Sequence, residues 1–428
     1  MRLLLTGGNV FYDGAFKRQS LLLDGGLVIF PSSEAAIEKL DRIYQLNNMY
    51  IVPGFADVHV HLREPGFSYK ETIHTGTLAA AKGGYTAVCS MPNLEPVPDC
   101  LENLKVQTDI IEREALVDVF PYASITKGRT GAGQLSDIAA LADKVIAFTD
   151  DGSGVADESV MRRAMLEVKK HSSMIAAHCE DVSLIKKGGC IHDGLYAKTH
   201  GFAGISSESE YEQLKRDIAL AKETGCKYHV CHVSTWQSVE AIRRAKEEGV
   251  DITCETAPHY LVLCEDDLID EGRFKMNPPL RSLRDKLALI EGLKDGTIDI
   301  IATDHAPHSA EEKAKGLKDS AMGISGLEAA FGVLYTHLVR TGVISLETLM
   351  DKLSAAPRKI FKLPDNAIKE GKLADITVFE TQTPYELKSE TFLSKGKATP
   401  FEGDTLYGKI YMTIHNGRVV WEKNSQKN

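Results

Sequence analysis

Two histidines, His59 and His61, stand one residue apart directly after the apolar run 51–56. On an extended strand, side chains two positions apart point to the same face, so both imidazoles can bind one metal ion. The pair alone is a weak signal, because two histidines on the exposed face of a strand, or two hydrogen-bonded core histidines, would show the same spacing. The apolar lead-in, however, buries the strand, and Pro65 and Gly66 end it in a loop. The first hypothesis is therefore a metal site at a strand end.

Further residues of the metal-binding type follow later apolar runs. If the runs form parallel strands of a barrel, their carboxyl ends meet at one rim, and these side chains converge with His59 and His61. Each has an ordinary interpretation when taken alone, for instance a hydrogen-bonded core histidine or an aspartate that caps a helix. Their shared position favours a metal centre over coincidence. They are Asp150, Asp151, His178, His232 and Asp304.

This ligand set is too large for one catalytic zinc ion, which usually has three protein ligands and an open position. Four imidazoles and two carboxylates, one from Asp304 and one from either Asp150 or Asp151, fit two metal ions that share a bridging carboxylate and a bridging hydroxide. Two such ions lower the pKa of bound water toward about 7 and polarise a carbonyl oxygen, so the expected chemistry is hydrolysis or its reverse. Zinc suits these ligands best, although manganese, cobalt or iron would also fit them.

The elements that must position these residues alternate apolar strands with helical stretches, which is typical of a parallel α/β fold. Eight strands, each followed by a helical segment, predict a TIM (β/α)8 barrel. An open doubly wound sheet is the second candidate, but the Gly-x-Gly-x-x-Gly pattern expected after its first strand is missing. The expected strands are 52–61, 85–91, 117–123, 144–150, 173–178, 227–233, 251–256 and 298–304.

Both ends of the chain read as short strands and turns without a long helical period. Neither end has enough strands for a stable sheet by itself. We therefore expect one small β-sandwich domain built from residues 1–51 and 366–428, with the catalytic barrel, residues 52–365, inserted between the two parts.

Composition excludes several classes of protein. With 43% hydrophobic and 26% charged residues the chain is ordinary globular protein, and its net charge of −10 argues against nucleic-acid and acidic-membrane partners. No run is long enough for a membrane span, and the first six residues are too short for a signal peptide, so a cytoplasmic protein is expected. The eight cysteines lack a C-x-x-C pair, and disulfides are not expected.

Four motifs resemble the amidohydrolase superfamily and, within it, the dihydroorotases of the bacterial long-chain class. They are residues 57–66, 90–93, 276–281 and 302–308, the last followed by Lys313. The resemblance covers nearly the whole chain and is most specific at the first and last motifs. It implies the same barrel with a two-part β-domain and the same pair of metal ions.

By that resemblance, His59, His61 and Asp304 would hold one metal ion, and His178 and His232 the other, with an aspartate bridging them. Many relatives bridge with a carboxylated lysine, but residues 148–152 contain no lysine. Asp151 is the expected bridge, with Asp150 as the alternative, since strand alternation lets only one of them face the metals. His229 could replace His232, but His232 is nearer the strand end.

Substrate recognition is expected to use Arg63, because a guanidinium can bind a carboxylate through two parallel hydrogen bonds. The plain alternative for Arg63 is a surface salt bridge with Glu64. The resemblance implies that Asn93 and His308 share the substrate carboxylate and that Asn277 contacts a pyrimidine ring. A strand-end asparagine is also a common turn residue.

Asp304 is the expected proton shuttle, which would accept a proton from the hydroxide during attack and pass it to the departing amide nitrogen. The polar segment 309–322 reads equally as a solvated loop or as a lid over the substrate.

The activity implied by the resemblance is the reversible cyclisation of N-carbamoyl-L-aspartate to L-dihydroorotate with loss of water, the third step of pyrimidine synthesis. The alternatives are another cyclic-amide hydrolase, such as a hydantoinase or allantoinase, and a non-catalytic scaffold. Hydantoinase-type relatives generally lack the arginine that Arg63 provides, and scaffolds have typically lost metal ligands. The expected partner is a small-molecule substrate, with a homodimer as the expected assembly; association with aspartate transcarbamoylase stays open.

Overall fold

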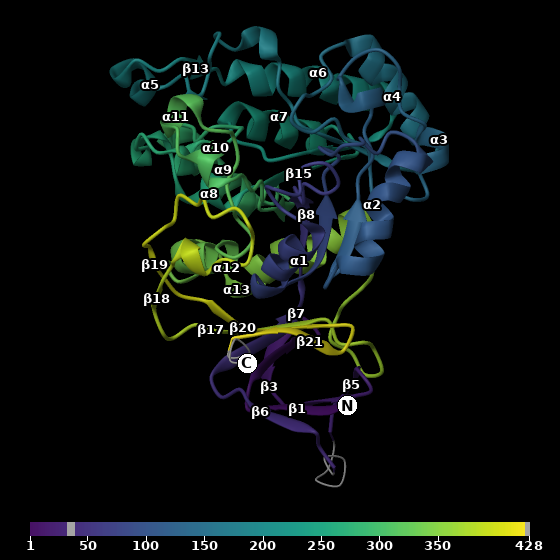
Figure 1. Cartoon of the computed structure of the whole chain (residues 1–428), viewed down its shortest axis with the longest axis vertical. Helices are drawn as coiled ribbons and strands as arrows, with labels where there is room; N and C mark the ends of the chain where they lie inside the picture. The colour runs from purple at the N-terminus through teal and green to yellow at the C-terminus, as the bar shows by residue number, and fades with distance from the viewer. Residues whose placement is uncertain (32–38, 424–428) are drawn as a thin grey trace.

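The computed structural model describes residues 1–31 and 39–423. Figure 1 shows two parts, an α/β body and a β-sheet unit beneath it, with the purple N-terminal and yellow C-terminal strands together in the sheet unit. Within the described ranges, no helix combines the length and the apolar character needed to cross a lipid bilayer.

The sheet unit consists of two packed sheets. Their facing side chains form one buried cluster that includes Leu3, Leu23, Ile51, Val378 and Met412. The first sheet has the order β5-β4-β1-β6 and the second β21-β20-β17-β7-β2-β3. The strands of the first are β1 (Arg2–Thr6), β4 (Leu21–Asp24), β5 (Leu27–Ile29) and β6 (Arg42–Gln45), and those of the second are β2 (Asn9–Tyr12), β3 (Ala15–Arg18), β7 (Met49–Pro53), β17 (Ile376–Glu380), β20 (Lys409–His415) and β21 (Arg418–Glu422).

The chain enters the barrel at Gly54. The expected strand 52–61 is two strands, because β7 ends at Pro53 in the sheet unit and β8 (Phe55–Val60) begins the barrel. A Cβ atom at Gly54 would lie 2.3 Å from Oγ1 of Thr86, so only glycine allows this close passage. The β7–β17 pairing, Ile51 opposite Val378, joins the two ends of the chain in one sheet.

Seven parallel strands and three isolated bridges form the barrel. Strands β8, β9 and β10 pair in one sheet and β11, β14, β15 and β16 in another. Phe148 bridges both Ala123 and Ile175, and Val60 bridges His305, which closes the ring. The strands are β9 (Tyr85–Ser90), β10 (Asp118–Pro121), β11 (Met174–Ala177), β14 (Lys227–Val230), β15 (Ile252–Thr256) and β16 (Ile300–Ile301). The predicted TIM barrel is confirmed.

The fourth expected strand, residues 144–150, is the weakest part of the ring. Only Phe148 forms bridges there, because the chain turns away at Asp150 and Asp151 to build the rim. Continuous apolar character thus predicted burial correctly but overestimated the ladder at this position.

Helices cover the outside of the barrel and bury one face each. Helix α9, for example, begins with the Ser282–Asp285 capping box and ends at Gly296 in the left-handed conformation. The main helices are α1 (Ile73–Lys82), α2 (Leu101–Glu114), α4 (Glu158–Lys170), α6 (Glu208–Thr224), α7 (Trp236–Glu247), α9 (Leu283–Asp295) and α14 (Ala356–Phe361).

Shorter elements build the rims and connections. They are helices α3 (Ile138–Leu141), α5 (Leu195–His200), α8 (Pro258–Val262), α10 (Ala310–Lys313), α11 (Gly316–Asp319), α12 (Ala330–Leu334) and α13 (Leu346–Met350), strands β12 (Ile191–His192), β13 (Gly204–Ile205), β18 (Tyr385–Glu386) and β19 (Thr405–Leu406), the 3-10 turns η2 (Lys127–Arg129), η3 (Val182–Leu184), η4 (Glu265–Asp267), η5 (Gly272–Phe274) and η8 (Ser389–Thr391), and the π turns η6 (Tyr335–Val339) and η7 (Asp351–Ala355).

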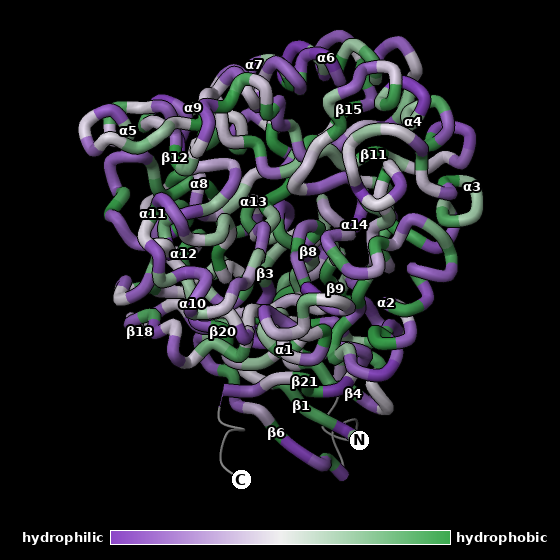
Figure 2. The backbone as a smooth tube through the Cα atoms, turned by 45° about the horizontal axis from the view of Figure 1, so that its top comes forward, coloured by the Kyte–Doolittle hydropathy of each residue, from purple (hydrophilic) through white to green (hydrophobic). Residues whose placement is uncertain are grey.

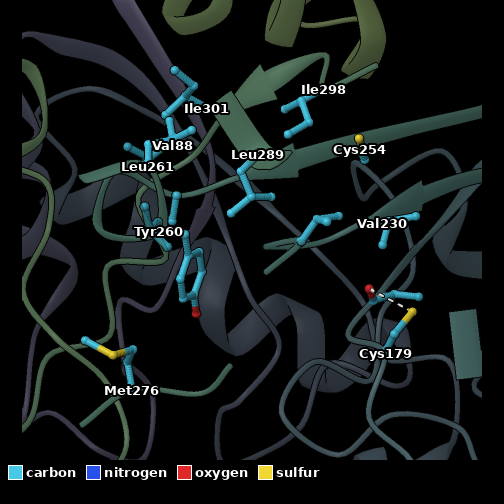
Figure 3. Close-up of a cluster of buried hydrophobic side chains, with 14 of the residues drawn as sticks. Val88, Cys179, Val230, Cys254, Tyr260, Leu261, Met276, Leu289, Ile298 and Ile301 are labelled. Atoms are coloured by element: carbon cyan, nitrogen blue, oxygen red, sulfur yellow. Dashed lines mark hydrogen bonds between the residues drawn. The ribbon is translucent and has the colours of Figure 1, made fainter. Parts of the chain in front are cut away.

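The core lies between strands and covering helices. Figure 2 shows hydrophilic and hydrophobic stretches alternating along the outer helices α6 and α7, as expected for helices with one buried face. In Figure 3, Val230 and Cys254 of adjacent strands lie near Leu289 of helix α9. This packing makes the strands a rigid frame for the residues at their ends.

Candidate metal centre

His59 and His61 lie at the end of β8 and share two carboxylate neighbours. The Nε2 atom of His59 lies 3.4 Å from Oδ1 of Asp151 and 3.5 Å from Oδ1 of Asp304. The Nε2 atom of His61 lies 3.2 Å from Oδ1 of Asp304 and 3.5 Å from Oδ2 of Asp151. The barrel thus brings together residues almost 250 positions apart in the sequence, Asp304 and His61.

His178 and His232 also lie near Asp151. Oδ1 of Asp151 lies 3.5 Å from Nε2 of His232 and 3.8 Å from Nδ1 of His178. These two imidazole nitrogens are 2.9 Å apart. His59, His61 and Asp151 form one group with metal-binding geometry, and Asp151, His178 and His232 form a second.

Asp151 and Asp150 face different ways. The Asp150 carboxylate accepts hydrogen bonds from the backbone N–H groups of Ile125 and Thr126 and from the Thr126 hydroxyl, so it fastens the loop after β10. Asp151 is the aspartate that faces the histidines. Of the two aspartates left open by the sequence, the structure places only Asp151 where two metal ions could share it.

The buried polar atoms of this cluster fit metal ions. Nε2 of His59 and Oδ1 of Asp151 are buried without a hydrogen-bond partner among the described residues. Leaving such atoms unpaired is costly, so they indicate a group that the protein atoms do not supply. Ligand atoms bound to one tetrahedral zinc lie roughly 3.3 Å apart, and the separations here are 2.9 to 3.8 Å. The donor set therefore fits zinc or a similar divalent ion.

The charges of the cluster favour metal binding. Burial alone would raise the pKa of Asp151, but the imidazoles of His59 and His232 hold the pKa of this carboxyl well below its usual range. Burial and the Arg63 guanidinium lower the pKa of His61 to about 4, which keeps its imidazole neutral. Burial opposes ionisation of Asp304, yet His59 and His61 keep its pKa below the ordinary value. The centre thus offers charged carboxylates and a neutral His61 at neutral pH.

Glu255 of β15 supports the cluster from below and was missed by the sequence interpretation. Its Oε1 atom accepts a hydrogen bond from Nδ1 of His59 at 2.6 Å, and its Oε2 atom lies 3.2 Å from Nε2 of His229. His229 therefore points into the barrel beneath the centre, whereas His232 faces Asp151. The available signal was a charged residue inside a predicted barrel strand, because a buried carboxylate requires partners.

Arg63 lies above the centre and does not pair with Glu64. Its Nε donates to the carbonyl of Pro307 at 3.3 Å, and its Nη2 lies 3.3 Å from Nε2 of His308. Glu64 instead accepts from the backbone N–H of Ile73 at 2.9 Å and so fastens the start of helix α1. Burial lowers the pKa of Arg63 to about 10, so its guanidinium stays charged at neutral pH.

The other three predicted substrate residues lie around the same rim. Asn93 donates to the backbone carbonyl of Asp151 at 2.9 Å, and its own amide oxygen is buried without a hydrogen-bond partner in the described structure. Asn277 donates to Glu180 at 3.0 Å, and Glu180 lies 3.5 Å from Nε2 of His178. His308 donates from Nε2 to the carbonyl of Met322 at 2.8 Å.

The segment 309–322 is folded against the rim rather than extended into solvent. It contains helices α10 and α11, and the buried Nζ of Lys313 donates to the carbonyls of Lys275, Ala321 and Gly323 at 2.7 to 2.9 Å. The segment begins next to His308, so its position determines where that imidazole lies.

Comparison with known proteins gives a consistent result. A family model described as Dihydro-orotase-like matches residues 48–238. A dihydroorotase of Bacillus cereus (strain G9842) is 48% identical over 415 residues, which cover 96% of each chain. A dihydroorotase of Bacillus thuringiensis (strain Al Hakam) is also 48% identical over 415 residues and 96% of each chain.

Solved structures share the fold at lower sequence identity. The L-hydantoinase from Arthrobacter aurescens superimposes with a TM-score of 0.86 at 24% identity, covering 98% of this chain and 96% of that one. The dihydropyrimidinase from Brevibacillus agri NCHU1002 gives a TM-score of 0.85 at 22% identity, covering 99% and 95%. These likenesses concern the barrel and its β-sandwich.

Proposed function

The chain belongs to the dihydroorotase family of cyclic amidohydrolases, and from that premise we propose that it catalyses the reversible cyclisation of N-carbamoyl-L-aspartate to L-dihydroorotate with loss of water. The observation that carries the proposal is the position of Arg63, a half-buried arginine whose guanidinium lies close enough to His61 to lower its pKa, beside a cluster with unpaired metal-type donors. Both carbamoyl aspartate and dihydroorotate carry a carboxylate, which such a group binds well. The reaction belongs to pyrimidine synthesis, and we place the protein in the cytoplasm.

The proposed centre holds two zinc ions. His59, His61 and Asp304 would hold one ion, His178 and His232 the other, and Asp151 both. Bound zinc supplies a Lewis acid and a water molecule of lowered pKa. The unpaired Nε2 of His59 and Oδ1 of Asp151 support this assignment.

Asp304 is the proposed proton carrier. Because the pKa of Asp304 is lowered, its side chain is ionised before substrate binds. Its Oδ1 atom lies 3.2 Å from Nε2 of His61, within the proposed metal centre. In ring opening it accepts the proton of the attacking water and then donates it to the departing amide nitrogen. In cyclisation the same proton moves in the opposite direction.

The remaining residues orient the substrate. Arg63 binds its carboxylate, with Asn93 and His308 beside it, and Asn277 contacts the ring. The amide oxygen of Asn277 has no hydrogen-bond partner among the described residues, so it can accept from a ring N–H. Both ring nitrogens of His308 have neighbours, Met322 and Lys70, so contact with substrate would replace one of them.

Ring opening of L-dihydroorotate by the zinc-loaded protein tests the proposal, followed as loss of ultraviolet absorbance. Hydantoin and allantoin serve as parallel substrates, and protein stripped by a chelator serves as control. We expect turnover of dihydroorotate alone, lost after chelation and restored by zinc. Turnover of hydantoin or allantoin in its place would contradict the assignment. Protein that binds no zinc when zinc is supplied and turns over no substrate would favour a scaffold.

Two points of assembly belong to the same proposal. We propose a homodimer, which sedimentation of the purified protein measures directly. Association with aspartate transcarbamoylase is tested by mixing the two enzymes: a change in sedimentation together with a change in dihydroorotate turnover supports the association.

A further inference from the structure

Glu255 connects the two halves of the centre from below. Its carboxylate is fully buried, and its ion-pair neighbours among the described residues are the imidazoles of His59 and His229. Besides accepting from Nδ1 of His59 at 2.6 Å, Oε1 accepts from the backbone N–H of His232 at 3.2 Å. One oxygen therefore touches a histidine from each of the two groups that face Asp151.

The bond to His59 determines which ring nitrogen of that residue is free. Because the carboxylate accepts from Nδ1, the proton is on Nδ1 and the lone pair on Nε2. Nε2 is the atom that lies 3.4 Å from Asp151 and 3.5 Å from Asp304. A carboxylate behind a metal-binding imidazole also increases the basicity of the ring and fixes its orientation.

The bond to His232 acts on the backbone. His232 has a φ of 34°, a left-handed conformation that is unfavourable for residues with a Cβ atom. The turn directs its imidazole toward Asp151, 3.5 Å away. A hydrogen bond from its N–H to a buried carboxylate stabilises this turn, so the same side chain orients a ligand on the opposite side of the centre.

His229 supports Glu255 in turn. Its Nε2 lies 3.2 Å from Oε2 of Glu255, and its Nδ1 is 2.8 Å from the hydroxyl of Thr253. The ring of Phe361 contacts the imidazole in a T-shaped arrangement, with 4.9 Å between centroids. Oε2 is thereby held by His229, which does not face Asp151, while Oε1 contacts His59 and the backbone of His232.

We propose that Glu255 is a positioning residue that couples the two metal-binding groups, by fixing the tautomer of His59 and the backbone turn at His232. The inference rests on the proposed metal centre and deepens it. Its consequence is that one substitution below the centre weakens both ions together, whereas loss of a single ligand would weaken mainly the ion that it holds.

The test is zinc affinity of Glu255→Gln, measured without substrate by competition with a chromogenic chelator. Glutamine keeps the shape and an acceptor oxygen but removes the charge. We expect roughly a 10- to 100-fold loss of affinity at both sites, with much of the dihydroorotate turnover recovered at saturating zinc. Because zinc binding is measured directly, the experiment decides the role of Glu255 even if the substrate assignment fails.

Asp217→Asn is the matched control, since Asp217 is a fully buried carboxylate that accepts from the Tyr228 hydroxyl at 2.8 Å and contacts no candidate ligand. It should lower thermal stability without changing zinc affinity. If Glu255→Gln fails to fold, His229→Gln replaces it, with an expected loss of several-fold. Zinc affinity within twofold of the parent in the folded variant would overturn the proposal, as would a loss confined to one site.

Discussion

Asp304 occupies a backbone turn that the barrel strand could not provide by itself. Its φ is 48°, and at the end of the sixth strand His232 has a φ of 34°. Each left-handed turn costs about 1–2 kcal/mol and is retained because contacts compensate for it, such as that of Asp304 with His61 at 3.2 Å. Both turns swing a side chain from the direction of the strand into the centre, which is where strained residues commonly serve function.

Replacing Asp304 with asparagine removes the proposed proton carrier while keeping its shape. We expect kcat for dihydroorotate to fall by about 10²- to 10⁴-fold, the usual contribution of a positioned acid–base group. Thermal unfolding of the zinc-loaded protein should change little. A variant that keeps more than a tenth of the parental kcat at full zinc occupancy would exclude this role.

Replacing Arg63 with lysine keeps the positive charge but removes the forked donor pair. Loss of a charge-assisted hydrogen bond of about 1.5–3 kcal/mol corresponds to a fall in kcat/KM of roughly 10- to 150-fold. The loss should appear mainly in KM for both dihydroorotate and carbamoyl aspartate. Arg113→Lys, on the exposed surface of helix α2, is the control; equal effects of the two substitutions would argue against carboxylate binding by Arg63.

At the scale of elements, the rim segment that follows β16 is held by one side chain. Lys313 of α10 donates three hydrogen bonds to backbone carbonyls, and His308 at the start of the segment donates to Met322 near its end. Short helices of four residues have little intrinsic stability. The segment therefore depends on these tethers, and the position of His308 depends on the segment.

Replacing Lys313 with methionine leaves those three carbonyls without their donor. We expect faster amide hydrogen exchange across residues 309–323 and a KM for dihydroorotate raised by about tenfold, since each buried unpaired group costs about 1–3 kcal/mol. Zinc content should be unchanged, because the metal-type residues lie elsewhere on the rim. Lys315→Met, an exposed change in the same segment, is the control. Unchanged exchange in the Lys313 variant would mean that other contacts hold the segment.

At the scale of the molecule, a charged cluster joins the barrel to the sheet unit. His415, at the end of β20, lies 2.8 Å from Asp375 beside β17 and 3.4 Å from Asp118 of barrel strand β10. Burial alone would lower the pKa of His415, but Asp118 and Asp375 raise it to about 9. The charged imidazole thus links the two parts at neutral pH.

Because the folded-state pKa exceeds the unfolded value of about 6.5, this link stabilises the protein fully below pH 6.5. Its contribution is lost as pH rises through about 9. We expect His415→Gln to lower the free energy of unfolding by about 1–3 kcal/mol at pH 6 and hardly at all at pH 10. Urea unfolding at several pH values measures this difference, with His200→Gln as an exposed control. A pH-independent difference would contradict the linkage.

The sequence alone determined the barrel and the gathering of metal-type residues at its rim. Eight apolar runs with helical segments between them are compatible with few folds. In a barrel of parallel strands, the carboxyl ends of all the strands lie at the same rim. The His59–His61 pair is local, because its two-residue spacing on a strand fixes both side chains on one face. The β-sandwich could also be anticipated, since the strands at either end are too few to form a sheet alone.

Tertiary structure decided the side-chain directions and the strand boundary that residue spacing in the sequence does not determine. Which of Asp150 and Asp151 faces the histidines depends on the loop after β10, whose N–H groups donate to Asp150. The division of strand 52–61 at Gly54 follows from Thr86 lying against that glycine. Glu255 could not be assigned to the centre because its partners, His59 and His229, come from two other strands. Side-chain direction inside a barrel is set by neighbouring strands, and only the closed barrel supplies those neighbours.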